Sequence, residues 1–591
     1  MDSAQNKPTR SPQAPDKVDP EAPADASMAP PRSDGIRDTI ESIVVAFILA
    51  FVFRAFMVEA FVIPTGSMAS GLYGQHAYHR CKLCQYPFAY GLREEQRALT
   101  QDGSMRSQQG TLAHQYAVRC PNCGYKGEGN SPINTPDKPV VGNAGDRILV
   151  LKWPYDIGGE WLGPHRWDVV VFKDPEDGET NFIKRLIGLP GEVLQILDGD
   201  IYTAPIDQVP APIVEALSKP PQPWNPEYRR LNPAQFEQLA ALLHIRRKTP
   251  MAQQSLWMIH HDHDFKPDPS IPRDPSFTPP MWVPEREDSG WNTASPQLRY
   301  VPGKEGDDWL LLTGKRIEDD YGYNNVGAAS SGPPPPQQLV GDVLLKFVLT
   351  PESASGAFKL YLSKGSDEFT CTIDADGTVR LFKIGLRGAL VQLQKNQIDP
   401  IVAGKPLSVE FENLDYRVAL RINGERVVAT VDSQYAPDPV KLFKAFGRSD
   451  SANRALIRIA SDRMPLQIDH LAVYRDVYYR SDSVLEERSV MGKQNPLAHL
   501  PGWGTTLNPI LLRKEPAEYF CMGDNSPQSK DSRLWWEVCP ILEKRGDYQK
   551  GTVPADLMIG RAFFVYWPSG YRISKDTPGV IPNVGRMRII R

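Results

Sequence analysis

Two residues that lie far apart in the chain have the types needed for peptide-bond hydrolysis. Ser67 lies between a glycine and a methionine, immediately after the only long apolar segment, and is a candidate nucleophile. A serine hydroxyl is mostly protonated at neutral pH, so it needs a base within hydrogen-bond reach. No His–Asp pair with an obvious signature lies nearby in the sequence. A lysine can serve instead, because burial lowers its pKa toward neutrality, and Lys184 lies in the largely apolar run 182–191.

Four of the seven cysteines form two CxxC pairs, Cys81 with Cys84 and Cys120 with Cys123. Two such pairs resemble a zinc ribbon, in which each pair offers two thiolates to one tetrahedral metal. The 35 residues between the pairs are more than a four-cysteine site usually has. Disulfides are the competing interpretation if the domain is extracytoplasmic, and unpaired thiols are the third. In each case the cluster is structural, because nothing indicates the open coordination position of a catalytic zinc.

A further metal-ligand pattern occurs at residues 260–264, which read His-His-Asp-His-Asp. No second ligand set with helical or strand spacing accompanies it. We therefore predict a solvated polar loop here.

Composition limits the classes of function. A chain of 591 residues has room for two to four domains. Its net charge is −4 and its lysines and arginines form no basic stripe, so we expect no nucleic-acid partner. The 55 prolines indicate many loops and linkers.

The N-terminal part of the chain divides into two segments. Residues 1–38 are rich in Pro, Ala, Asp and Ser, and we predict a disordered tail. Residues 39–62 are predicted to form a membrane helix. The uncharged core of this helix, residues 42–53, is shorter than the roughly 20 residues that a spanning helix needs. A buried amphipathic helix is therefore the alternative.

Short β-rich runs follow and predict an antiparallel sheet in residues 63–202, which also contain the cysteine-rich insert 81–123. The runs are 146–152, 168–172, 181–189 and 192–202, the last with a turn at 198–200. Residues 203–337 contain Pro-rich patches and one predicted helix at 233–247, and we expect this segment to be irregular.

Residues 338–480 predict a β-sandwich. Nine runs read as strands: 339–349, 357–363, 368–373, 378–384, 407–412, 416–422, 425–431, 455–460 and 468–474. Asp376-Gly377 and Asn423-Gly424 predict hairpin turns. The end of this segment, residues 466–476, resembles laminin-G/concanavalin-like jelly rolls. A glycan- or protein-binding role and a spacer role are both open.

Four ordered motifs resemble those of bacterial type I signal peptidases, namely residues 64–68, 145–150, 182–191 and 523–533. With flanking strands they cover about 39–80, 140–202 and 510–590, so residues 481–591 would complete the catalytic domain. The predicted fold class is mainly β: an antiparallel β catalytic domain behind one N-terminal transmembrane helix, with an inserted β-sandwich.

The resemblance implies a Ser–Lys dyad without a catalytic cofactor. Ser67 would be the nucleophile and Lys184 the general base. The remaining roles follow from the same motifs: the Ser67 backbone N–H and the Thr65 hydroxyl would form the oxyanion hole, Ser529 would orient Lys184, Asp531 and Arg533 would form a supporting ion pair, and Asp524 with Asn525 would belong to the same turn. Structural zinc at the four cysteines stays a separate hypothesis.

The implied substrates are secretory precursors with Ala-x-Ala-type cleavage sites. The implied location is the cytoplasmic membrane, with lipid as a partner and the catalytic domain outside. One alternative is a membrane-anchored binding or adhesion protein that uses the jelly roll on an inactive peptidase scaffold. Another is a self-cleaving regulator, against which the apolar segment and the lack of a DNA-binding module argue.

Overall fold

The computed structural model describes residues 35–52, 56–92, 116–125, 142–219, 230–271, 278–303, 305–324, 326–328, 337–446, 455–481, 501–570 and 581–590. The chain divides into two units, Met1–Ala55 and Phe56–Arg591. Most of the predicted tail, residues 1–34, lies outside the described residues.

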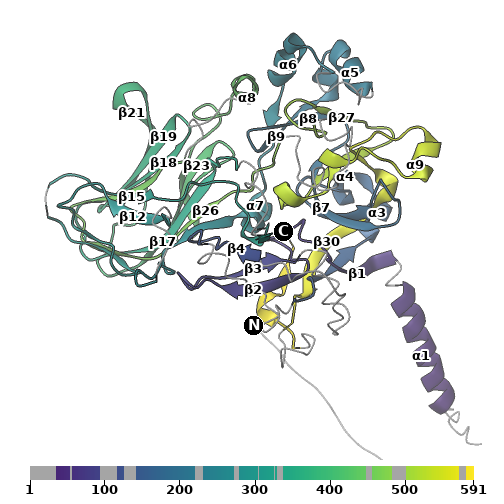
Figure 1. The fold of residues 1–591 in the computed structure, drawn as a ribbon, viewed down its shortest axis with the longest axis horizontal. Coiled ribbons are helices and arrows are strands. Elements are labelled where there is room, and N and C mark those ends of the chain that lie inside the picture. Colours follow the sequence, from purple (N-terminus) through teal and green to yellow (C-terminus); the bar gives the residue numbers. More distant parts are fainter. Residues whose placement is uncertain are drawn as a thin grey trace, which may run out of the picture. The chain divides into compact units, whose positions relative to one another are not determined.

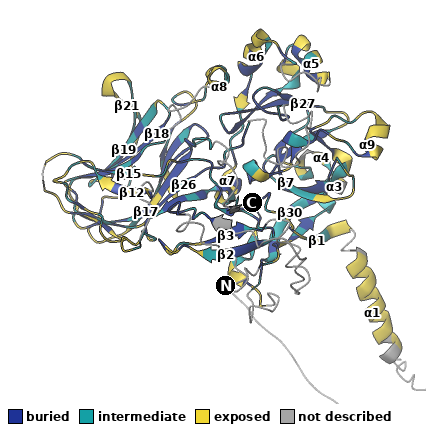
Figure 2. Cartoon of the chain, viewed as in Figure 1, coloured by how far each residue is buried: buried dark blue, intermediate teal, exposed yellow. Residues whose placement is uncertain are grey.

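The first unit contains helix α1 (Gly35–Val52), which exposes apolar side chains from Ile40 to Phe51 (Figure 2). Within the described ranges, no helix has the length and apolarity needed to cross a membrane. The prediction that the helix continues to residue 62 was wrong, because residues 58–62 form strand β1 (Val58–Val62). This run pairs with β5 (Arg147–Leu151) along its whole length, so distant pairing determines its conformation.

The catalytic sheet combines strands from both ends of the second unit. Its order is β1-β5-β30-β6-β7-β28-β29, with β31 beside β30, and all these pairs are antiparallel. The remaining bounds are β6 (Val169–Lys173), β7 (Asn181–Gly188), β28 (Glu518–Met522), β29 (Val553–Pro554), β30 (Met558–Trp567) and β31 (Arg588–Ile589). Figure 1 shows the yellow strand β30 beside the bluish strands of the same sheet. Residues 481–591 therefore complete a sheet that begins at residue 58.

A smaller sheet has the order β10-β9-β8-β27. Its strands are β8 (Glu192–Leu197), β9 (Asp200–Pro205), β10 (His244–Ile245) and β27 (Ile510–Leu512). The predicted turn between β8 and β9 is confirmed, with positive φ at Asp198 and Gly199. The predicted helix 233–247 was too long: α6 (Pro233–Ala240) starts at a capping box on Asn232 and ends before β10, which pairs with β9.

The inserted domain is a β-sandwich of two antiparallel sheets that enclose one apolar core. The first sheet has the order β13-β14-β26-β17-β22-β23-β24, with β11 beside β26, and the second has the order β12-β15-β25-β18-β19-β20-β21. The strands are β11 (Met258–Asp262), β12 (Met281–Pro284), β13 (Trp291–Asn292), β14 (Leu298–Tyr300), β15 (Asp308–Thr313), β17 (Val343–Pro351), β18 (Ala357–Lys364), β19 (Asp367–Asp374), β20 (Thr378–Ile384), β21 (Leu390–Gln397), β22 (Leu407–Leu414), β23 (Arg417–Ile422), β24 (Glu425–Ala429), β25 (Ile457–Asp462) and β26 (Leu466–Arg475).

All nine predicted strands of the sandwich are confirmed, but its predicted start at residue 338 was wrong. Strands β11 to β15 come from residues 258–313, which we predicted to be irregular. These strands are short, and three of them, β11, β14 and β15, pair with β25 or β26, more than 140 residues further along the chain. Local sequence carries little of that information.

Strand β2 (His76–Arg80) leads into the cysteine-rich insert, which contains β3 (Pro87–Gly91) and β4 (Tyr116–Val118). Strand β4 pairs with β16 (Val326–Ala328), which precedes the sandwich strand β17. The remaining helices are α3 (Trp153–Ile157), α4 (Gly159–Leu162), α5 (Ala211–Ser218), α7 (Pro250–Leu256), α8 (Pro439–Ala445) and α9 (Pro540–Arg545).

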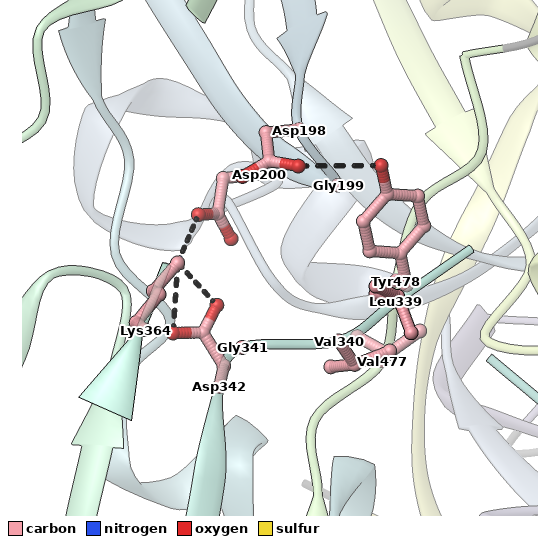
Figure 3. A pocket seen from close by; sticks show the side chains of 10 residues that line it. All are labelled: Asp198, Gly199, Asp200, Leu339, Val340, Gly341, Asp342, Lys364, Val477 and Tyr478. Carbon is pink, nitrogen blue, oxygen red and sulfur yellow. Dashed lines mark hydrogen bonds and ion pairs between the residues drawn. The ribbon is translucent and has the colours of Figure 1, made fainter. Parts of the chain in front are cut away.

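A buried ionic cluster joins the smaller sheet to the sandwich. The Lys364 Nζ lies 2.8 Å from Asp342 and 3.4 Å from Asp200 of β9 (Figure 3). Nearby, the Lys248 Nζ lies 2.6 Å from Asp415 and 2.7 Å from Asp476. Four carboxylates surround two ammonium groups, so the buried cluster has two more acidic than basic groups.

Candidate active site

Ser67 lies in a turn that follows β1 and is 7% exposed. The turn is closed by the Ala69 N–H, which donates to the Gly66 carbonyl at 3.0 Å, and by the Leu72 N–H, which donates to the Met68 carbonyl at 2.8 Å. Thr65 is exposed on the same turn. The nucleophile candidate is thus held by backbone hydrogen bonds directly beyond the strand.

Lys184 lies on β7 opposite Val170 of β6, and its side chain is buried. Its Nζ donates a hydrogen bond of 2.6 Å to the Ser67 Oγ. Burial lowers the pKa of Lys184 to about 8; the nearby Asp531 carboxylate opposes this shift and the Arg533 guanidinium favours it. The structure therefore brings the predicted nucleophile together with a lysine that deprotonates near neutral pH.

Asp531 and Arg533 form the bidentate ion pair that the motif predicts. The Arg533 Nε and Nη2 donate to the two Asp531 oxygens at 2.9 and 2.7 Å, and both side chains are buried. Burial alone would raise the pKa of Asp531, but Arg533 and the Gly523 N–H hold this pKa below its usual value. The pair thus fixes the start of the turn 523–525.

Asp524 has a partner that sequence reasoning missed. The Arg185 Nε and Nη2 each donate to an Asp524 carboxylate oxygen at 2.7 Å, and both residues are buried. Arg185 follows Lys184 directly on β7, so its side chain points to the opposite face of the sheet. The only available signal was an arginine beside the candidate base in an apolar run.

Asn525 contacts the nucleophile turn directly. Its backbone N–H donates to the Ser67 carbonyl and its Nδ2 donates to the Gly66 carbonyl, both at 3.0 Å. We predicted only that it shares a turn with Asp524.

Ser529 is buried but does not make the contact that we predicted. No hydrogen bond of its Oγ occurs among the described residues, and the structure records none to Lys184. The hydroxyl lies against Gly523, where a Cβ atom would overlap with it and with the Ser67 carbonyl. Ser529 therefore lies beside the dyad without orienting Lys184 in this structure.

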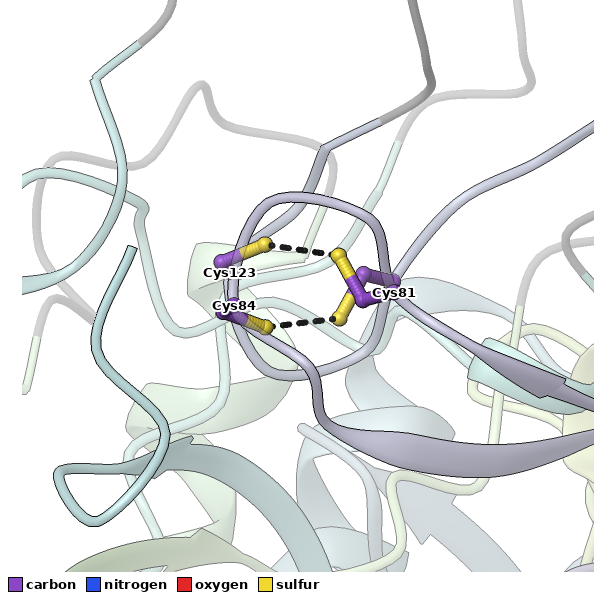
Figure 4. Close-up of side chains that lie close together, drawn as sticks. Cys81, Cys84 and Cys123 are labelled. Atoms are coloured by element: carbon purple, nitrogen blue, oxygen red, sulfur yellow. Dashed lines mark hydrogen bonds between the residues drawn. The ribbon is translucent and has the colours of Figure 1, made fainter. Parts of the chain in front are cut away.

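The four predicted cysteines come together, and Figure 4 labels Cys81, Cys84 and Cys123 of this group. The Sγ atoms of Cys81 and Cys123 are 3.6 Å apart, and those of Cys84 and Cys120 are 3.7 Å apart. Tetrahedral zinc with bonds of about 2.3 Å places its sulfurs about 3.8 Å apart, whereas a disulfide needs about 2.05 Å. The residues therefore fit a four-thiolate metal site.

The prediction of a solvated loop at residues 260–264 was wrong. His260 and His261 lie on β11, and both are buried, as is His263. Burial lowers the pKa of His261 to about 3 and that of His263 to about 4. The strand was missed because polar residue types usually indicate exposure.

Comparison with known proteins agrees with this geometry. A family model described as "Signal peptidase, peptidase S26" matches residues 138–264 and 467–567. The match includes Lys184 and the turn 523–533 but not Ser67, and its interruption contains most sandwich strands. Signal peptidase I of Rickettsia typhi and that of Rickettsia prowazekii are each 54% identical over 39 residues, which are 7% of this chain and 15% of each relative. These matches support a peptidase of the S26 type, and they span only a small part of the relatives' length.

Solved carbohydrate-binding and galectin structures match part of this chain. A carbohydrate-binding module, CBM66 from Bacillus subtilis, is 13% identical, covers 32% of this chain and 94% of its own, and has a TM-score of 0.21. The Caenorhabditis elegans galectin LEC-6 is 19% identical, and the match covers 23% of this chain and 82% of the galectin, with a TM-score of 0.16. Scores this low carry no argument about fold or ligand. The predicted mainly β fold class with an inserted β-sandwich is confirmed by the strand pairing itself.

Proposed function

We propose that this chain is a Ser–Lys endopeptidase that removes signal peptides from secretory precursors. The observation that carries the proposal is the 2.6 Å hydrogen bond from the buried Lys184 Nζ to the Ser67 Oγ. A buried lysine with a pKa of about 8 is partly neutral at physiological pH. Such a lysine can remove the hydroxyl proton that a free lysine would leave in place.

The reaction would follow the usual acyl-enzyme sequence. The Ser67 Oγ attacks the scissile carbonyl while neutral Lys184 takes its proton, and the resulting ammonium donates a proton to the leaving amine. The Ser67 N–H and the exposed Thr65 hydroxyl would hold the oxyanion. Water then attacks the acyl-enzyme, with Lys184 again acting as the base.

The sheet supports binding of an extended substrate. Among the described strands, β1 pairs only with β5, and we propose that an extended peptide pairs with its other edge. The apolar side chains of Ile63, Met68 and Leu72 are buried around the Ser67 turn. We extend the proposal to substrates with a small apolar residue before the cleaved bond, as in Ala-x-Ala sites.

Membrane attachment is part of the proposal. α1 exposes an unbroken run of apolar side chains from Ile43 to Phe51, which would place the catalytic unit beside the bilayer that holds its substrate. We extend the proposal to one structural zinc held by Cys81, Cys84, Cys120 and Cys123, which would brace the insert and take no part in the reaction.

The test is cleavage of a pre-protein by the detergent-solubilised chain. Ser67→Ala and Lys184→Met should each abolish cleavage, with methionine keeping most of the lysine volume. Ser70→Ala, an exposed serine three residues further along, and Lys173→Met on the neighbouring strand β6 are matched controls that should stay active. If the folded wild type is inert, the binding-scaffold alternative replaces the peptidase, and a glycan or protein pull-down with the whole chain follows.

A further inference from the structure

A segment that precedes the sandwich strand β17 reaches the nucleophile turn. This segment, residues 319–324, includes the helical turn η3 (Gly322–Asn324). The Tyr323 ring stacks on Tyr73 with centroids 5.7 Å apart, and its hydroxyl donates to the Gln75 carbonyl at 3.0 Å. A Cβ atom on Gly66 would overlap with the same ring. The residue before Ser67 is therefore a glycine at a position where the Tyr323 ring of segment 319–324 leaves no room for a Cβ atom.

Asn324 forms a reciprocal amide pair with Asn525. The Asn324 Nδ2 donates to the Asn525 Oδ1 at 2.6 Å, and the Asn525 Nδ2 donates to the Asn324 Oδ1 at 2.7 Å. The same Asn525 Nδ2 also donates to the Gly66 carbonyl. Asn324 thus holds the Asn525 amide in the orientation in which it reaches Gly66.

The Gly66 carbonyl and the Ser67 N–H belong to one planar peptide group. A hydrogen bond that fixes the direction of this carbonyl also fixes the direction of the N–H. Asn525 additionally binds the Ser67 carbonyl through its backbone N–H, so the peptide groups on both sides of Ser67 are held. The N–H in question is the oxyanion donor of the proposed reaction.

We propose that Asn324, in segment 319–324 before the sandwich strand β17, is a positioning residue of the oxyanion hole. It acts through Asn525. This inference rests on the proposed peptidase function. Asn324 touches neither the dyad nor, by this geometry, the substrate. Its effect is to keep the Ser67 N–H aimed at the site where negative charge develops, where loss of a donor costs about 10²–10³ in rate.

The segment is in turn anchored to the sandwich. The Arg475 Nη2 of β26 donates to the Asp320 carbonyl at 2.7 Å, and its guanidinium lies 4.7 Å from the centroid of the Tyr321 ring. The Tyr321 hydroxyl donates to the Asp524 carbonyl at 3.0 Å. The orientation of the nucleophile turn therefore depends on residues that lie outside the catalytic sheet.

The experiment compares kcat and KM of the full chain and of Asn324→Leu, which removes both amide hydrogen bonds at similar volume. We expect kcat to fall about tenfold, KM to change less than twofold, and the pH limb that reports Lys184 to stay in place, because the dyad is untouched. Asn292→Leu, an exposed asparagine of the same insert on β13, should keep full activity.

A double-mutant cycle tests the route through Asn525. If Asn324 acts only by holding that amide, Asn324→Leu should cost nothing further in an Asn525→Leu background. If the losses caused by the two substitutions are independent and multiply, the proposal is overturned. It is also overturned if Asn324→Leu keeps full activity while Ser67→Ala, prepared in the same way, is inactive. An unchanged melting temperature separates a positioning effect from loss of folding. An inert wild type is a different result, because it refutes the peptidase function itself.

Discussion

The pKa of Lys184 gives the sharpest test of the proposed chemistry. Lys184 must be neutral to take the Ser67 proton, so kcat/KM should rise with pH as the ammonium titrates. Its Nζ is buried and lies 5.2 Å from the centroid of the Phe182 ring. Burial is the largest cause that lowers the pKa, from 10.5 to about 8.

The size of the effect follows from this shift. The drop from 10.5 to about 8 corresponds to roughly 3 kcal/mol between the two protonation states. At pH 7 about one tenth of the Lys184 side chains would be neutral, against about one in 3,000 for an unshifted lysine. Burial thus supplies a roughly 300-fold gain in active base.

The assay is kcat/KM between pH 6 and pH 10.5 on a peptide without groups that titrate in this range. Log(kcat/KM) should rise with a slope of one below about pH 8 and then reach a plateau. The substitution Phe182→Ala admits water to Lys184, so the midpoint of the rise in log(kcat/KM) should move upward by about one pH unit. Circular dichroism at each pH shows that the chain stays folded.

Three results would refute this reasoning. A limb near 10.5 would show that Lys184 is solvated during the reaction, and a limb near 6.5 would indicate a histidine as the base. A limb that Phe182→Ala leaves in place would show that burial beside this ring is not the cause.

Two further predictions concern the rest of the chain. Burial raises the pKa of Asp342 to about 6, although Lys364 opposes the shift. Wild-type stability should therefore fall as pH rises from about 4 to 7, because the folded carboxyl holds its proton more tightly than the unfolded one. Asp342→Asn should flatten this fall by up to about 3 kcal/mol in urea unfolding; equal slopes would contradict the assignment. At the cysteine cluster, denatured unreduced protein should release about one zinc and show seven reactive thiols, the full number in the chain. Disulfides at the four CxxC cysteines would leave three thiols and no zinc, and Cys81→Ser should lose the metal.

Elements with strong local signals were predictable. The alternating runs in residues 339–474 became strands, and Gly377 and Gly424 adopt the positive φ that their hairpin turns require. Strand β21 was missed because its exposed residues give little alternation. Strands β11 to β15 were missed because they are short and lie among prolines, and because β11, β14 and β15 pair with strands far along the chain.

The candidate site likewise has contacts that the local sequence predicted and contacts that it did not. Motif spacing predicted the ion pair of Asp531 and Arg533, whose members are two residues apart. It did not predict Arg185 beside Asp524, 339 residues away, or Asn324 beside Asn525, 201 residues away. Neither partner belongs to a local pattern.

By itself the sequence identified the candidate residues and the two CxxC pairs. It also determined the local strands and turns, because these depend on neighbours along the chain. Only the tertiary structure decided that Ser67 and Lys184, 117 residues apart, lie 2.6 Å from each other. It also decided that Lys184 is buried enough to lose its proton near pH 8. Both properties arise from non-local strand pairing, which places β7 beside the turn after β1 and excludes water from the space between them.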